Sequence, residues 1–128
     1  MIVADTHTWL WWTDDPGRLS EAARTAIEVA DRVLVSAISC LELSTLVRRG
    51  RIAVDRPVEA WIAQALGGER FEAVPVTPRI ASAAGLLPDA FPGDPADRII
   101  YATALSVGAR LVTRDDAIHA FDARSTVW

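Results

Sequence analysis

The chain has 128 residues, of which 51% are hydrophobic and 23% charged, and a formal net charge of −4. This length suits one domain, and the composition excludes a disordered or collagen-like chain. No stretch approaches the ~20 apolar residues that span a bilayer, and Met1–Asp5 lacks the basic start of a secretory signal. We therefore expect a cytoplasmic, membrane-free single domain over residues 1–128, and the lone Cys40 fits a reducing compartment.

All 13 basic residues are arginines, and the chain contains no lysine. The absence of lysine excludes a Walker-type phosphate loop and any Schiff-base or pyridoxal chemistry. The negative net charge argues against a non-specific polyanion coat. A nucleic-acid substrate stays open, because a metal ion can supply the missing positive charge.

Short apolar runs alternate with segments that begin at helix-capping residues. One of these segments has an apolar face at helical spacing, made by Val58, Trp61, Ile62, Ala65 and Leu66. In chain order, the sequence predicts a strand at Ile2–Asp5, a helical turn at Thr6–Thr13, a turn at Asp14–Gly17, a helix from the Ser20 cap to Ala30, a strand at Val33–Ser36, a helix from the Ser39 cap to Arg49, the helix around Trp61, a strand at Phe71–Val76, a helix from Thr77, a loop at Pro88–Gly93, a helix from Asp94 to Val107, a strand at Arg110–Thr113, a short helix at Asp115–Ala120 and a last strand at Thr126–Trp128.

This alternation predicts an α/β fold of three layers. Parallel strands need long crossover connections, and helices in those connections cover the sheet. We expect a central parallel sheet of four to five strands with helices on both faces.

Acidic residues fall where the predicted strands end or where helices begin. Asp5 ends the first strand, Glu42 follows the second, Asp94 and Asp97 open the long helix, and Asp115 follows the fourth strand. Sites in open α/β sheets form outside the carboxyl ends of the strands. The sequence therefore predicts that these acids meet at one edge of the sheet.

Helix capping offers a second explanation for most of these acids. Ser39 and Glu42 have the spacing of a capping box, and Asp94 and Asp97 have that of an N-cap and N3 pair. Asp5 differs, because it ends an apolar run with no arginine nearby, and buried aspartates are rare unless paired. As a set, converging carboxylates repel unless they hold a cation, and oxygen ligands favour Mg²⁺ or Mn²⁺.

The two histidines do not suggest a zinc site. His7 and His119 lie far apart in the sequence, and Cys40 stands alone. We interpret both histidines as ordinary surface or turn residues.

Four segments together resemble the motifs of PIN-domain nucleases, in the family's order and spacing and over essentially the whole chain. In length, the chain resembles the toxin half of VapBC-type toxin–antitoxin modules. The matching segments are Ile2–Thr6, Ser36–Glu42 with Arg48–Gly50, Gly93–Ala104 and Leu111–Asp115.

The resemblance implies a Mg²⁺- or Mn²⁺-dependent endoribonuclease that cleaves RNA and is inhibited by a VapB-type antitoxin. The family's catalytic acids fall on Asp5, Glu42, Asp97 and Asp115, and Asp94 matches an additional metal-binding acid. Thr6 and Thr113 match positions that orient a carboxylate or a water. Asp116 has no firm family role, and we interpret it as a residue that supports a ligand from behind or faces solvent.

Two further groups have alternative interpretations. Arg48, Arg49 and Arg51 could bind RNA phosphates or simply neutralise a helix C-terminus. Among Trp9, Trp11 and Trp12, we expect one or two to pack in the core and one to face a second subunit of a homodimer or the antitoxin. Stacking on RNA bases is the lesser alternative.

Other classes fit the sequence less well. A haloacid-dehalogenase-type phosphatase needs a second aspartate where His7 stands, and it needs a lysine, as does a receiver domain. A PIN-fold protein without a toxin role, either an RNA-processing nuclease or an inactive binding module, remains the alternative.

Overall fold

A parallel sheet of five strands forms the centre of the computed structural model, which describes residues 1–128. The strand order is β3-β2-β1-β4-β5, and Ala4 of the central strand pairs with Val35 on one side and Val112 on the other. The strands are β1 (Ile2–Ala4), β2 (Val33–Ser36), β3 (Phe71–Val74), β4 (Arg110–Val112) and β5 (Thr126–Val127).

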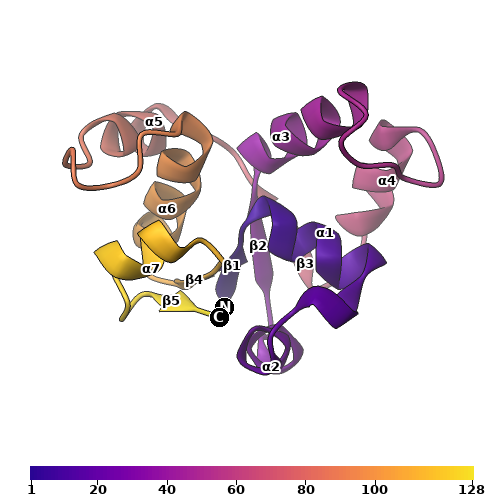
Figure 1. Ribbon diagram of the computed structural model, residues 1–128, viewed down its shortest axis with the longest axis horizontal. Coiled ribbons are helices and arrows are strands. Elements are labelled where there is room, and N and C mark those ends of the chain that lie inside the picture. Colours follow the sequence, from indigo (N-terminus) through magenta and orange to yellow (C-terminus); the bar gives the residue numbers. More distant parts are fainter.

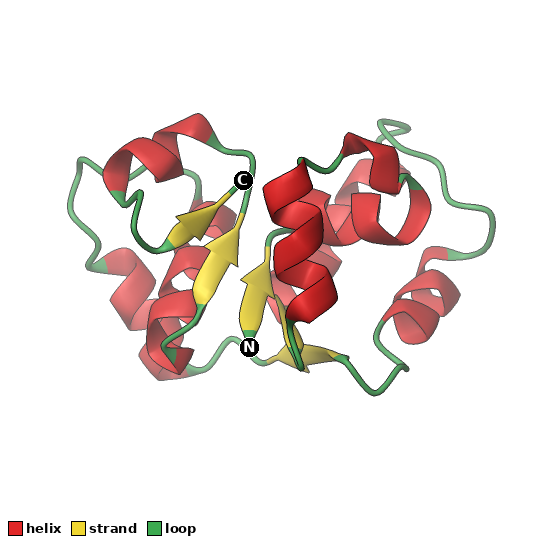
Figure 2. Ribbon diagram, turned by 90° about the horizontal axis from the view of Figure 1, so that it is seen from below, coloured by secondary structure: helices red, strands yellow, loops and turns green.

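Helices connect the strands and cover both faces of the sheet (Figures 1 and 2). None of the helices is long and apolar enough to cross a membrane. They are α1 (Thr6–Asp14), the 3₁₀ turn η1 (Pro16–Arg18), α2 (Glu21–Val29), α3 (Ala37–Arg48), α4 (Val58–Ala65), α5 (Pro78–Gly85), α6 (Pro95–Val107) and α7 (Asp116–Phe121).

Successive strand residues point to opposite faces, so the sheet separates two cores. Ala4, Val33 and Val112 belong to a core shared with α1, α2, α3 and α4. Val3 and Leu111 pack on the other face, beneath α6 and α7. Figure 1 shows the same division, with α5, α6 and α7 on one side and α1 to α4 on the other. The predicted three-layer α/β architecture is therefore confirmed.

The predicted start of α3 is wrong. Ser36 caps the helix by accepting a hydrogen bond from the backbone N–H of Ile38, and Ser39 is buried inside the first turn. The reason is that β2 passes into α3 without a loop, so the last strand residue is also the cap. The helix around Trp61 matches its prediction, since Trp61 is buried in the first core.

The three N-terminal tryptophans do not form an exposed patch. Trp9 is fully buried and packs edge-on against Trp61, with ring centroids 5.2 Å apart. Trp11 is 8% exposed, and Trp12 is partly buried against the same core. The expectation that one or two of the three pack in the core is thus confirmed for Trp9 and Trp11. Trp9 cannot be the tryptophan that faces a partner, because the core under α1 encloses its side chain.

Glycine at position 108 is required by backbone geometry, whereas glycine at position 85 is not. Gly108 ends α6 with φ 65°, and Gly85 ends α5 without a positive φ and with open space where a Cβ would lie. We expect Gly108→Ala to lower the free energy of unfolding by about 1 kcal/mol. Gly85→Ala, the matched control, should leave it unchanged or raise it by about 0.5 kcal/mol. Denaturant melts of both variants check this, and equal losses would contradict the assignment.

Candidate active site

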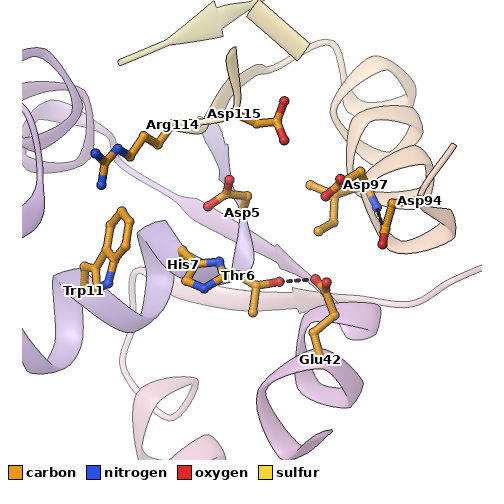
Figure 3. A pocket seen from close by; sticks show the side chains of 10 residues that line it. Asp5, Thr6, His7, Trp11, Glu42, Asp94, Asp97, Arg114 and Asp115 are labelled. Atoms are coloured by element: carbon orange, nitrogen blue, oxygen red, sulfur yellow. Dashed lines mark hydrogen bonds between the residues drawn. The ribbon is translucent and has the colours of Figure 1, made fainter. Parts of the chain in front are cut away.

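Five carboxylates line one pocket of about 470 Å³ at the edge of the sheet. Figure 3 shows Asp5 near the middle, with Glu42, Asp94 and Asp97 to one side and Arg114, Trp11 and His7 to the other. The lining residues are Asp5, Thr6, His7, Trp11, Glu42, Asp94, Asp97, Ile100, Arg114 and Asp115.

Sheet topology explains this meeting. The chain enters the sheet at β1 and continues to β2 on one side, and it later returns to β4 on the other side. Crevices form at such a reversal, outside the carboxyl ends of the strands. Asp5 follows β1 directly, and Asp115 lies just beyond β4, so they stand on the two strands that flank the reversal. The predicted convergence of acids from distant segments is what this topology produces.

Three of the acids are helix caps as well as pocket residues. Oδ1 of Asp5 accepts from the N–H of Thr8 at 2.8 Å. Oδ1 of Asp94 and Oδ1 of Asp115 accept in the same way at the starts of α6 and α7, at 3.0 and 2.9 Å. The expectation that Asp5 has no capping role is therefore wrong, because α1 begins immediately after it. Each cap fixes the carboxylate and leaves its second oxygen without a protein donor.

Among the acids of the pocket, Asp97 has the largest shift in pKa. It lies in the first turn of α6, half-buried, and its carboxylate accepts no hydrogen bond from the protein. Burial, followed by the charges of Asp94, Asp115, Glu42 and Asp5, raises the pKa of Asp97 to about 7. A carboxylate in this position is stabilised by a cation.

Glu42 approaches the pocket from the second turn of α3, so the predicted capping box with Ser39 is wrong. The hydroxyl of Thr6 donates a hydrogen bond to the Glu42 carboxylate and lies 2.9 Å from the hydroxyl of Ser39. Burial raises the pKa of Glu42, the bond from Thr6 opposes this, and the charges of Asp94 and Asp5 add to it. Thr6 thus fixes one oxygen of the Glu42 carboxylate through this hydrogen bond.

A half-buried arginine, Arg98, holds the loop that precedes Asp94. The guanidinium of Arg98 donates hydrogen bonds to backbone carbonyls of Pro92, Leu87 and Phe91, and also to Ala84 and Pro88. These bonds tie the 88–93 loop and the end of α5 to α6. The sequence did not predict this role. The acceptors are backbone carbonyls, which carry no residue-specific signal, and they come within reach of Arg98 only when the loop is folded.

The segment after β4 is held from behind by His119. Its Nε2 lies 2.6 Å from the carbonyl oxygen of Thr113, and its Nδ1 lies 2.7 Å from the hydroxyl of Thr126. The interpretation of His119 as an ordinary surface or turn residue is wrong, since its half-buried ring joins α7 to the segment after β4 and to β5. The Thr113 hydroxyl accepts from the N–H of Asp115 at 3.1 Å, whereas Asp116 is exposed and lies outside the pocket.

Cationic side chains stand beside the acids, and two of the three arginines predicted from the sequence are among them. A second pocket of about 460 Å³ shares His7, Glu42 and Asp94 with the first and is also lined by Arg49 and Arg51. Arg48 is exposed and lines neither pocket. Arg114 and His7 were both missed as pocket residues. The available signal was their position in the sequence, since Arg114 directly precedes Asp115 and His7 lies two residues after Asp5.

The donor set fits a hard divalent cation. Every charged ligand candidate is a carboxylate, and the capping aspartates keep one oxygen free. No three His, Cys, Asp or Glu side chains are arranged to surround one ion. Mg²⁺ commonly binds through one or two carboxylates and retains several waters, so a closed cage is not needed.

Comparison with known proteins assigns most of the chain to one family model. The model of the PIN domain matches residues 2–124. The chain is 46% identical to Ribonuclease VapC22 of Mycobacterium tuberculosis strain H37Rv, over 99% of this chain and 98% of that protein.

Solved structures have the same fold at low identity. A toxin–antitoxin complex from Klebsiella pneumoniae aligns with a TM-score of 0.72 and 20% identity, over 100% of this chain and 97% of that one. VapBC2 from Rickettsia felis, bound to a DNA fragment from its promoter, aligns with a TM-score of 0.67 and 15% identity, over 98% of this chain and 97% of that one. At these identities the likeness concerns the fold.

The raised pKa of Asp97 makes stability depend on pH when divalent ions are removed by a chelator. In the folded state Asp97 holds its proton up to about pH 7, whereas in the unfolded state it loses it near its ordinary value of 3.8. The stability that the bound proton provides is therefore lost as pH rises from about 4 to about 7. We expect Asp97→Asn to have a higher Tm than the wild type at pH 7.5, with the difference shrinking towards pH 4. A pH-independent difference would contradict this.

Proposed function

The chain belongs to the PIN-domain family, and we propose that it is a divalent-metal-dependent endoribonuclease that acts as the toxin of a toxin–antitoxin pair. The observation that carries the proposal is the single pocket lined by Asp5, Glu42, Asp94, Asp97 and Asp115. The proposed unit is one PIN domain over residues 1–128, acting on RNA in the cytoplasm. The 46% identity to Ribonuclease VapC22 supports the ribonuclease assignment.

In the proposed reaction, the oxygen of a water bonds to the phosphorus of an RNA phosphodiester and loses a proton, while one P–O ester bond breaks and its leaving oxygen takes up a proton. Mg²⁺ or Mn²⁺ bound among the carboxylates would stabilise charge on the phosphate, activate water and stabilise the leaving oxygen. The proposed ligand set is Asp5, Asp97 and Asp115 with Asp94 and Glu42. An ion would bind one or two of these carboxylates directly and the others through its waters. Thr6 orients Glu42 through its hydrogen bond.

Arg49 and Arg51 are the proposed contacts for RNA phosphates that lie beyond the acidic pocket. Neither forms an ion pair with a carboxylate, and both line the pocket that adjoins the acidic one through His7, Glu42 and Asp94. Free guanidinium groups bind phosphate oxygens well. We therefore keep Arg49 and Arg51 as contacts to the RNA backbone. Arg48 keeps only the role of a cation at the C-terminus of α3.

The proposed regulator is a VapB-type antitoxin. The relative named above is a VapC ribonuclease, and solved structures with this fold include toxin–antitoxin complexes. A homodimer is also part of the proposal. Leu105 is 51% exposed and lines an apolar groove between α5 and α6, which supplies apolar surface for association.

The nuclease proposal predicts that neutralising a pocket acid abolishes cleavage without unfolding the protein. Asp5→Asn keeps the helix cap, because asparagine caps as well as aspartate. Both Asp5→Asn and Glu42→Gln should reduce Mg²⁺-dependent cleavage of bulk RNA by about a hundredfold or more, while Tm holds or rises as a crowded charge is removed. Chelation should stop wild-type cleavage, and Mg²⁺ or Mn²⁺ should restore it.

The matched control is Asp89→Asn, which neutralises an exposed acid that has no ion pair and lies outside both pockets. It should cleave at the wild-type rate. Full activity of a folded Asp5→Asn or Glu42→Gln variant would count against the nuclease centre, as would cleavage that survives chelation.

The toxin proposal predicts growth arrest on expression in a bacterial host. Arrest should require the intact acidic pocket, so the Asp5→Asn variant should grow normally at equal protein level. Co-expression of the small reading frame next to the gene in its native genome should restore growth and protect RNA. Nuclease activity without arrest would leave the enzyme assignment intact and remove the toxin role.

A further inference from the structure

The acidic pocket has a second wall that the proposed hydrolysis does not use. His7, Trp11 and Arg114 line this wall, across from Glu42, Asp94 and Asp97 (Figure 3). Two of the three are aromatic rings and one is a cation. This chemistry differs from that of the acids and suits a different part of a bound nucleotide.

Trp11 forms the fixed base of this wall. Its ring contacts those of His7 and Trp128, with centroids 5.5 and 5.9 Å away. The guanidinium groups of Arg18 and Arg114 lie over it, at 5.4 and 5.9 Å from the ring centroid. A ring with contacts on several sides and 8% exposure cannot turn freely, so the groups resting on it are positioned in advance.

Arg114 has unused hydrogen-bond donors. It is exposed, it forms no ion pair and it donates no hydrogen bond to the protein, although Asp115 is its neighbour. Its cation–π contact with Trp11 holds the guanidinium at the mouth of the pocket. A guanidinium so placed can bind a phosphate through two donors.

His7 extends the aromatic surface towards the acids. Its ring leans on Trp11 at an interplanar angle of 51° and is exposed to the pocket. It also borders the second pocket, which contains Arg49 and Arg51. His7 therefore lies where the two pockets join, on the route a strand would take between Arg114 and these arginines.

We propose that His7, Trp11 and Arg114 form a nucleotide subsite in which the base next to the scissile phosphate stacks on the His7 ring and the adjoining phosphate binds Arg114. The inference rests on the proposed ribonuclease function. Bases of single-stranded RNA stack on aromatic side chains and on guanidinium planes. Because every base has a π-face, this subsite holds the strand without selecting one base.

Single-stranded RNA is favoured over a protein segment as the occupant by the charges along the wall. Arg114 is the only arginine that lines the acidic pocket, and Arg49 and Arg51 line the adjoining pocket. The aromatic rings of His7 and Trp11 therefore have cations on either side. A polyanion with regularly spaced planar groups complements that alternation.

The test compares binding of two fluorescein-labelled strands by anisotropy in Mg²⁺, using 2′-O-methyl oligouridine and an abasic strand of equal length. The wild type should bind the strand with bases more tightly. His7→Ala should weaken that binding about five- to tenfold while leaving the abasic strand unaffected, and His7→Phe should restore it. Arg114→Ala should weaken both strands and lower the salt dependence by about one phosphate contact.

Arg124→Ala is the control, since Arg124 is exposed and precedes β5, at the opposite end of the strands from the pocket. It should change neither affinity. Equal wild-type affinity for the two strands, or failure of His7→Phe to rescue His7→Ala, would overturn the subsite. Bulk-RNA cleavage by the wild type is measured alongside. Absent cleavage with intact base-dependent binding would reject the nuclease function but support the subsite.

Discussion

Repulsion among carboxylates is the constraint on which this site depends. Five acids share one pocket. The effect is largest for Asp97, because burial and the neighbouring carboxylates raise its pKa to about 7. Helix N-termini offset part of the repulsion, because their unpaired N–H groups carry partial positive charge. Asp5, Asp94 and Asp115 each cap a helix with one oxygen. Capping and metal binding are therefore compatible roles of the same side chains.

The sheet supplies the geometry that makes such crowding useful. With β1 and β4 adjacent, two capping aspartates project from neighbouring strand ends, and α6 brings its own N-terminus to the same edge. Arg98 anchors the loop before α6 through five backbone carbonyls. His119 anchors the segment after β4 from the opposite side. Rigid support of this kind fixes the segments that carry Asp94 and Asp115.

Charge is arranged unevenly around the pocket despite the net charge of −4. The acids are concentrated at the strand ends, while Arg114 lies at one margin and Arg49 and Arg51 at another. A polyanionic strand is attracted at these margins and repelled at the centre unless a cation is bound there. In the proposed enzyme, substrate binding and metal binding therefore support each other.

The sequence alone predicted the α/β class, the order of the elements and the positions of the acids at the strand ends. These features follow from local periodicity and turn chemistry, which the alternation of apolar runs and capping residues shows directly. The apolar face of the helix around Trp61 could be predicted for the same reason. Tertiary structure alone decided that Ser36 rather than Ser39 caps α3, that Trp9 is enclosed, and that His7 and Arg114 enter the pocket. Ser36 is the cap because its pairing with Val74 of β3 carries the strand up to the first residue of the helix. The burial of Trp9 and the direction of His7 and Arg114 depend on the segments, distant in sequence, that the fold packs against them.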